Sequence, residues 1–212
     1  MLNTNQISLF DLAPISHIKP VPPRLTDELK ADFVTSGKTS IFRSGLSAPV
    51  KVLIEKSLFQ KGASLNYGKG RHNFDSDGIE AVTHSCQNYD YVFQPDIDVL
   101  GASYTNVYAG YVVNTLPALA RTFVWCQMAK CTNTDIGVCF VAARTDKILG
   151  VKSGDGVITS KKTFQKSYKL NELVLEAKQH FDFVVEIKGK SGFAIVACSH
   201  SPLPDYIIQH AK

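Results

Sequence analysis

The sequence lacks the features that would assign it to a disulfide-stabilised or membrane-spanning class. Its five cysteines are odd in number and none stands in a C-x-x-C pair, so neither a disulfide framework nor a zinc knuckle is favoured. No apolar run approaches the roughly 20 residues needed to cross a bilayer, and the N-terminus has no basic head before an apolar stretch. We therefore expect a cytoplasmic protein with no membrane partner.

Several catalytic signatures are also missing. The six histidines show no metal-ligand spacing, so no metal is expected, and neither a G-x-S-x-G motif nor a Walker-type loop occurs. A formal charge of +4 permits a polyanionic partner without requiring one. The length of 212 residues and a hydrophobic content of 44% suit one compact domain.

The first 25 residues predict an extended arm, because they hold four of the nine prolines. We place the single domain at residues 26–212. "TDELKADF" predicts a helix capped by Thr26, and "SAPVKVLIEKSLF" predicts a second helix capped by Ser47, with apolar residues at helical spacing.

From Gly62 onward, short apolar runs alternate with helical segments, which is typical of a parallel sheet with helical crossovers. A hairpin is predicted in "FDFVVEIKGKSGFAIVACS". This α/β arrangement resembles the class I methyltransferase fold, a Rossmann-like sheet that is mostly parallel and ends in an antiparallel hairpin. The expected strands are residues 63–67, 89–93, 105–112 and 136–143, and the expected later helices are residues 117–130 and 170–180.

The stretch "LNYGKG" places Tyr67, Gly68 and Gly70 where a predicted strand ends. In open α/β sheets, ligands bind beyond the carboxyl ends of the strands, and glycine lets the backbone approach a ligand closely. Two glycines in a turn also occur without any ligand, so the residues alone leave both readings open.

Three motifs together resemble S-adenosylmethionine (SAM)-binding proteins. "LNYGKGRHNF" is similar to the turn "LDYGCGRG", "YDYVFQPD" puts Asp90 where a ribose-binding carboxylate is expected, and "YAGYVVNTLP" resembles a fourth-strand motif of the form "GYVLNVI". The resemblance implies SAM as the cofactor. The residues it implies in cofactor binding are Tyr67, Gly68, Gly70, Asp90, Asn114 and Leu116.

The flanking segments carry a narrower resemblance, over roughly residues 37–170. "SGLSAPVKVLIEKSLF" and "DGVITSKKTFQKSY" look like segments of methyltransferases associated with DNA phosphorothioation. This implies a SAM-dependent methyltransferase that acts on DNA or another nucleic acid.

Three positions depart from the family pattern. Asn66 stands where the family has aspartate, Lys69 where it has a small residue or cysteine, and Thr105 where an acid would open the fourth strand. A neutral amide accepts weaker hydrogen bonds than a carboxylate. The alternative is therefore a noncatalytic SAM-binding or DNA-binding protein, whereas the terminal hairpin disfavours a nicotinamide-dependent oxidoreductase.

Two segments carry the remaining predictions. In "VNTLP", the side-chain oxygen of Asn114 could accept a hydrogen bond from a nitrogen nucleophile while Pro117 holds the turn open, or Asn114 or Thr115 could simply cap the next helix. In "SKKTFQKSYK", the expected nucleic-acid contacts are Lys161, Lys162 and Lys166, interleaved with aromatic residues. A solvated loop with inward-facing aromatic side chains is the alternative.

Overall fold

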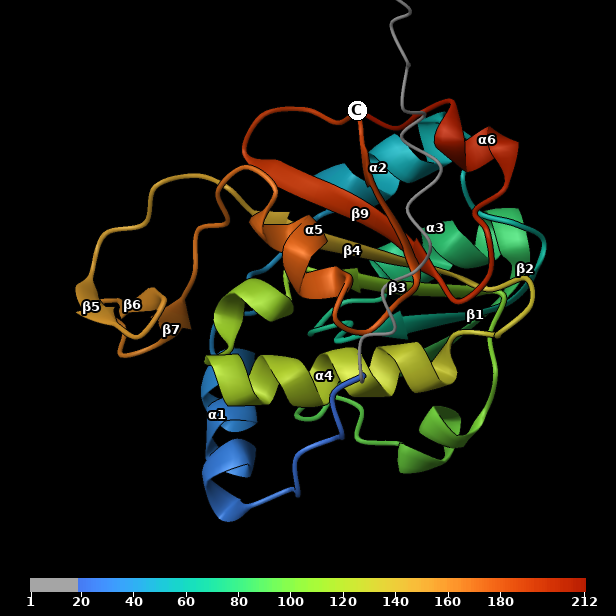
Figure 1. Ribbon diagram of the computed structural model, residues 1–212. Helices are drawn as coiled ribbons and strands as arrows, with labels where there is room; N and C mark the ends of the chain where they lie inside the picture. The colour runs from blue at the N-terminus through green and yellow to red at the C-terminus, as the bar shows by residue number, and fades with distance from the viewer. Residues whose placement is uncertain (1–18) are drawn as a thin grey trace, which may run out of the picture.

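The computed structural model describes residues 19–212, which form a mostly parallel sheet with helices on both faces (Figure 1). The strand order in this six-stranded sheet is β2-β1-β3-β4-β9-β8, and only β9 runs opposite to the other strands. Its strands are β1 (Gly62–Tyr67), β2 (His84–Tyr89), β3 (Asn106–Gly110), β4 (Val138–Arg144), β8 (Phe183–Ile187) and β9 (Phe193–Ser199).

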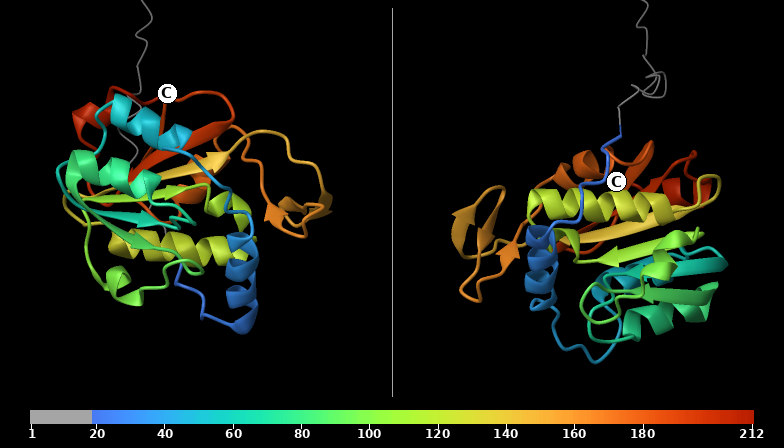
Figure 2. Two further views of the ribbon diagram at one scale, coloured as in Figure 1. Left: turned by 180° about the vertical axis from the view of Figure 1, so that it is seen from behind. Right: turned by 90° about the horizontal axis from the view of Figure 1, so that it is seen from below.

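The helices form two layers around this sheet, and α4 and α3 lie on opposite faces of it (Figure 2). One apolar core joins the sheet to α1, α4 and α5, and a second joins it to α2, α3 and α6. The helices are α1 (Asp27–Gly37), α2 (Ala48–Glu55), α3 (Phe74–Thr83), α4 (Ala118–Cys131), α5 (Glu172–Ala177) and α6 (Asp205–Ile208). Within the described residues, no helix has the length and apolarity needed to cross a membrane.

The predicted fold class is confirmed by the terminal hairpin. Strand β9 inserts between β4 and β8 and pairs antiparallel with both, with Cys198 opposite Cys139 of β4. Strand β4 is buried along Val138–Ala143, as expected for a central strand covered on both faces. The side chains of Thr26 and Ser47 cap α1 and α2 as predicted.

Two predicted elements are wrong in their bounds. A strand was expected at residues 89–93, but the observed strand, β2, ends at Tyr89. The polar sequence of β2 fits an edge strand, because β2 pairs only with β1. The aromatic residues that suggested a later strand instead pack on other elements, since the rings of Tyr91 and Phe33 are 5.0 Å apart. Helix α5 spans only part of the expected residues 170–180. Residues 1–18 of the predicted arm lie outside the described residues.

A small antiparallel sheet was not predicted from the sequence. It contains β5 (Val151–Ser153), β6 (Gly156–Ile158) and β7 (Phe164–Gln165). It projects from the body on the same side as α1 in every view (Figures 1 and 2). Such short strands show no alternation long enough to be recognised in a sequence.

A charge cluster centred on the buried Arg121 attaches this small sheet to the domain. The Arg121 guanidinium of α4 pairs with Asp155 in the β5–β6 turn and with Glu176 of α5, whose carboxylate also accepts from Trp125 and Tyr168. Burial of Asp155 would raise its pKa, but hydrogen bonds from Arg121 and Lys166 outweigh this and hold the pKa below its usual value. The cluster therefore joins α4, α5 and the small sheet.

The buried histidine His180 gives a prediction about pH. It lies against Trp125, with ring centroids 5.9 Å apart, and burial lowers its pKa from 6.5 to about 4. Between pH 6.5 and about 4, the His180 side chain is therefore protonated in the unfolded chain but neutral in the folded protein. The free energy of unfolding decreases as the pH falls through this range. We expect this residue to account for about 3 kcal/mol of that loss.

Urea unfolding of the native protein and of His180→Gln between pH 7 and pH 4 would measure this contribution. The variant should lose less stability over this range than the native protein does. His84→Asn, which alters an exposed histidine, is the control and should follow the native curve. Parallel curves for the native protein and His180→Gln would contradict the assignment.

Candidate functional site

A cleft of about 1330 Å³ opens at the carboxyl ends of β1, β2, β3 and β4. Its walls come from the turns after these strands, from the segment of residues 36–48 between α1 and α2, and from part of the small sheet. In an open α/β sheet this is the edge where ligands bind. Its volume exceeds the roughly 300–1,000 Å³ typical of a pocket for one small ligand.

The glycine turn predicted from the sequence forms one wall of this cleft. Gly68 and Gly70 both have φ of +71°, a conformation that side-chain-bearing residues rarely adopt. A Cβ on Gly68 would lie 2.4 Å from Val112 in the turn after β3. The glycine is therefore needed for the two turns to pack. Tyr67, just before it, is buried and lines the cleft.

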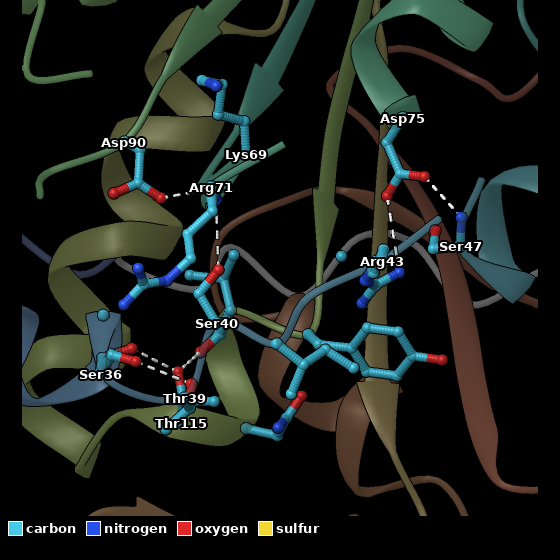
Figure 3. Close-up of a pocket in the computed structure, with 18 of the residues that line it drawn as sticks. Ser36, Thr39, Ser40, Arg43, Ser47, Lys69, Arg71, Asp75, Asp90 and Thr115 are labelled. Atoms are coloured by element: carbon cyan, nitrogen blue, oxygen red, sulfur yellow. Dashed lines mark hydrogen bonds and ion pairs between the residues drawn. The ribbon is translucent and has the colours of Figure 1, made fainter. Parts of the chain in front are cut away.

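Asp90 joins the turns after β1 and β2. Its carboxylate accepts hydrogen bonds from the backbone N–H groups of Gly70, Val92 and Phe93 at 2.9, 2.9 and 3.0 Å. A carboxylate offers about four lone-pair positions, so one remains for a ligand hydroxyl. Figure 3 shows Asp90 and Arg71 on one side of the cleft, with Arg43, Asp75 and Ser47 on the other.

The segment between α1 and α2 was not predicted as part of the site, yet it forms a whole wall. The hydroxyl of Ser40 accepts a hydrogen bond from the Arg71 N–H at 3.2 Å, and Ser36 bonds to Thr115 at 2.5 Å (Figure 3). Its sequence, "SGKTSIFRSG", carries no periodic signal. The only sequence signal for a role of this segment was the resemblance of the neighbouring residues to a known family.

The segment "VNTLP" follows β3 as a short 3-10 helix, η2 (Val113–Thr115). Asn114 lines the cleft but is almost fully buried. Its oxygen accepts from the Arg144 N–H, and its amide nitrogen donates to Gln165, both at 3.4 Å. These are long, weak bonds that a ligand could replace. Helix α4 has no side-chain cap, so the capping alternative for Asn114 and Thr115 is wrong.

Of the next two residues, Leu116 lines the cleft and Pro117 does not. Leu116 is extended, as expected before a proline, and lines the cleft. Its carbonyl accepts from Arg121 at 2.8 Å. Pro117 is the N-cap residue of α4 and is not among the cleft-lining residues.

The positions that depart from the family pattern have different surroundings. Asn66 lines the cleft, but its amide donates to Ser76 at 2.9 Å within the buried interior. Lys69 donates to Asn73 at 2.6 Å in the same loop. Thr105 lies before the amino end of β3, at the opposite edge of the sheet from the cleft.

The predicted basic segment is divided between surface and interior. Lys161 and Lys162 are exposed in the β6–β7 turn, and Lys161 lines the cleft. Lys166 is buried and donates to Asp155 at 2.9 Å, so a phosphate could reach it only if that ion pair opened. Phe164 and Tyr168 are also buried, which agrees with the alternative prediction of a loop whose aromatic side chains face inward.

The cleft carries an excess of positive charge. Seven of its lining residues are cationic and three are acidic. The cations are Lys38, Arg43, Lys51, Lys69, Arg71, Arg144 and Lys161. Across residues 19–212, no group of three or more metal-ligating side chains is placed to hold a metal ion.

Comparison with known proteins rests on structure. No family model matches the sequence, and no curated protein matches it either. The fold is similar to the Burkholderia thailandensis 1,6-didemethyltoxoflavin-N1-methyltransferase crystallised with 1,6-didemethyltoxoflavin and S-adenosylhomocysteine. The TM-score is 0.56 at 15% identity, over 85% of this chain and 92% of that one.

Two further structures align less closely. PigF with S-adenosylhomocysteine has a TM-score of 0.51 and 8% identity, over 82% of this chain and 66% of that one. The PH0226 protein from Pyrococcus horikoshii OT3 has a TM-score of 0.51 and 11% identity, over 71% and 87%. This chain has the class I methyltransferase fold. In that fold, the cleft described above lies at the ligand-binding edge of the sheet.

The three hydrogen bonds to Asp90 predict a measurable loss of stability in Asp90→Asn. The amide nitrogen cannot accept, so at least one backbone N–H would lose its partner, at a cost of about 1–3 kcal/mol. Urea unfolding would measure this. Asp98→Asn, which alters an exposed acid in the 3-10 helix η1 (Ile97–Gly101), should leave the stability unchanged. An unchanged midpoint for Asp90→Asn would show that the carboxylate does not hold the two turns together.

Proposed function

We propose that this protein is a SAM-dependent methyltransferase. The observation that carries the proposal is the glycine turn beside Asp90, at the ligand-binding edge of a class I methyltransferase fold. The structurally similar methyltransferase from Burkholderia thailandensis was crystallised with S-adenosylhomocysteine. When bound, SAM supplies an electrophilic methyl group on a sulfonium.

The residues of this chain fit such a cofactor in three respects. The left-handed glycines form the turn at the end of β1 that lines the cleft, the Asp90 carboxylate has one free acceptor position for a hydroxyl, and Leu116 and Tyr67 supply apolar surface. Asn66 supports the noncatalytic alternative, because its amide is engaged with Ser76 and provides no charge at the site.

We assign to Asn114 the role of positioning the nitrogen atom that accepts the methyl group. Asn114 lies at the carboxyl end of β3, and only long hydrogen bonds hold its side chain. Its oxygen can accept a hydrogen bond from an N–H of the nucleophile and so orient the lone pair for in-line attack. Pro117 contributes by holding the preceding residue in extended conformation.

The acceptor class has two candidates. A nucleic acid, as the sequence suggested, would be contacted through Lys161 and Lys162, with Lys166 released from Asp155. A small molecule would fit the cleft itself, and the similar Burkholderia structure holds the small molecule 1,6-didemethyltoxoflavin. We favour the small acceptor, because the buried Phe164 and Tyr168 cannot stack on bases. The relation to DNA phosphorothioation stays a prediction.

Cofactor binding can be tested by calorimetric titration with S-adenosylhomocysteine. The native protein should bind it, and Gly68→Ala should bind at least about tenfold more weakly, because the added Cβ would push Val112 and distort the turn. Gly154→Ala is the matched control, since Gly154 also has positive φ but open space around it. Absence of binding by the folded native protein would refute the proposal.

Catalysis can be tested by transfer of a radiolabelled methyl group to small molecules of a cell extract, to DNA and to RNA. Asn114→Ala should lower turnover on the order of a hundredfold and leave S-adenosylhomocysteine affinity nearly intact, because the lost bond acts in the transition state. Asn114→Asp, which keeps an acceptor oxygen, should retain more activity. Equal rates for all three proteins would remove Asn114 from the mechanism, and cofactor binding without transfer would favour the noncatalytic alternative.

A further inference from the structure

A strained tyrosine lines the cleft directly before Val112, the residue that packs against the glycine turn. Tyr111 follows the last residue of β3 and has φ of +63°, where a bulky side chain is rarely found. Its N–H donates to the Ala142 carbonyl of β4 at 2.8 Å, and its ring packs against Phe193. Strain of this kind persists only where the surroundings impose it, and it clusters at functional sites.

Two arginines lie beside this tyrosine. The Arg43 guanidinium carbon is 5.4 Å from the Tyr111 ring centroid, and Arg144 ends the neighbouring strand β4. Both arginines line the cleft, with side chains 28% and 49% exposed. The Arg144 N–H also donates to the Asn114 oxygen. This donor is the backbone N–H, so it places the main chain of Arg144 next to the residue assigned to the methyl acceptor.

Within residues 19–212, each guanidinium has one ion-pair partner and makes no side-chain hydrogen bond. Arg43 is 3.9 Å from Asp75, and Arg144 is 3.9 Å from Asp146, both beyond hydrogen-bond distance. Arg121 shows the contrast, because it is buried and donates to Glu176, Asp155 and a carbonyl. The two cleft arginines thus keep donors for a ligand, and an arginine fork matches the oxygens of a carboxylate or phosphate.

The cofactor does not account for these charges. SAM carries a sulfonium, an ammonium and one carboxylate, so its net charge is positive and an excess of cations repels it. The cleft also exceeds the size needed for one ligand. Ile41 and Phe42, which are 65% and 80% exposed, line the same cleft and offer apolar contact to the body of a second ligand.

We propose that Arg43, Tyr111 and Arg144 form a subsite for the anionic group, carboxylate or phosphate, of a small methyl acceptor. Its role in methyl transfer rests on the proposed function, whereas the anion binding does not. Burial raises the pKa of the Tyr111 phenol, although Arg43 opposes this, so the hydroxyl stays protonated and can donate to the anion. The arginines would supply charge and orientation beside Asn114.

The test is calorimetric titration with matched probes, with and without saturating S-adenosylhomocysteine. Benzoate and phenyl phosphate carry the anion, benzamide and phenol are their neutral counterparts, and inorganic phosphate lacks the apolar body. At least one anionic probe should bind about tenfold or more tightly than its neutral counterpart. Arg43→Gln and Arg144→Gln should each weaken that binding about ten- to a hundredfold, as expected for a lost charge-assisted bond. Arg24→Gln, an exposed arginine outside the cleft, should have no effect.

The possible failures are separable. If S-adenosylhomocysteine does not bind, the proposed function fails, and the titrations without it still decide the anion subsite. Equal binding of charged and neutral probes, or equal binding by native and Gln variants, would overturn the subsite. So would a loss of S-adenosylhomocysteine affinity in Arg43→Gln, because Arg43 would then belong to the cofactor carboxylate. Tight binding of a single-stranded oligonucleotide that is insensitive to both variants would move the acceptor to nucleic acid and also overturn it.

Discussion

The carboxylate of Asp90 is the interaction on which the shape of the cleft depends. Backbone donors from two loops converge on it, one from the turn after β1 and two from the segment after β2. The N–H groups of Gly68 and Lys69 also donate to the Tyr89 carbonyl at 2.7 and 3.2 Å, and the Asp90 carboxylate adds a charged acceptor that extends this contact to Gly70. The left-handed glycines then fit against Ser40 and Val112, which belong to two neighbouring segments of the cleft wall.

A second electrostatic element supports the opposite wall. The Arg121 cluster ties α4 and α5 to the small sheet, and the backbone N–H of Lys166 donates to the Asn114 carbonyl at 2.7 Å. The segment that carries Asn114 is therefore held from both sides, by β4 and by the residues after β7. Buried ion pairs add little net stability but penalise alternative arrangements strongly, because an unpaired buried charge is costly. The position of Asn114 thus depends on residues far away in sequence.

The two positively charged regions of the protein differ in exposure. Lys166 belongs to the interior, where Asp155 is a close partner at 2.9 Å, whereas Arg43 and Arg144 line the cleft and their acidic partners are 3.9 Å away. Sequence composition cannot distinguish these cases, because a lysine between aromatic residues gives the same local sequence pattern whether it is buried or lies on a binding surface. Exposure and ion pairing decide which charges a ligand can reach.

The sequence by itself determined the elements whose signals are local. Helix caps at Thr26 and Ser47, the apolar strand β4 and the terminal hairpin follow from side-chain chemistry within a few residues, and so the fold class could be predicted. The glycine turn was placed correctly at the end of β1, whereas Asp90 follows β2 directly although the predicted strand of residues 89–93 contained it. The edge strand β2 was misplaced because its polar residues gave no hydrophobic signal.

Only the tertiary structure decided what surrounds those elements. Residues 36–48 become a cleft wall, Lys166 is buried, and Arg43 contacts Tyr111 although their residue numbers differ by 68. These outcomes depend on contacts between segments distant in sequence. No local pattern encodes them, because the energy of a charge or an aromatic ring depends on the burial and partners that the folded chain provides.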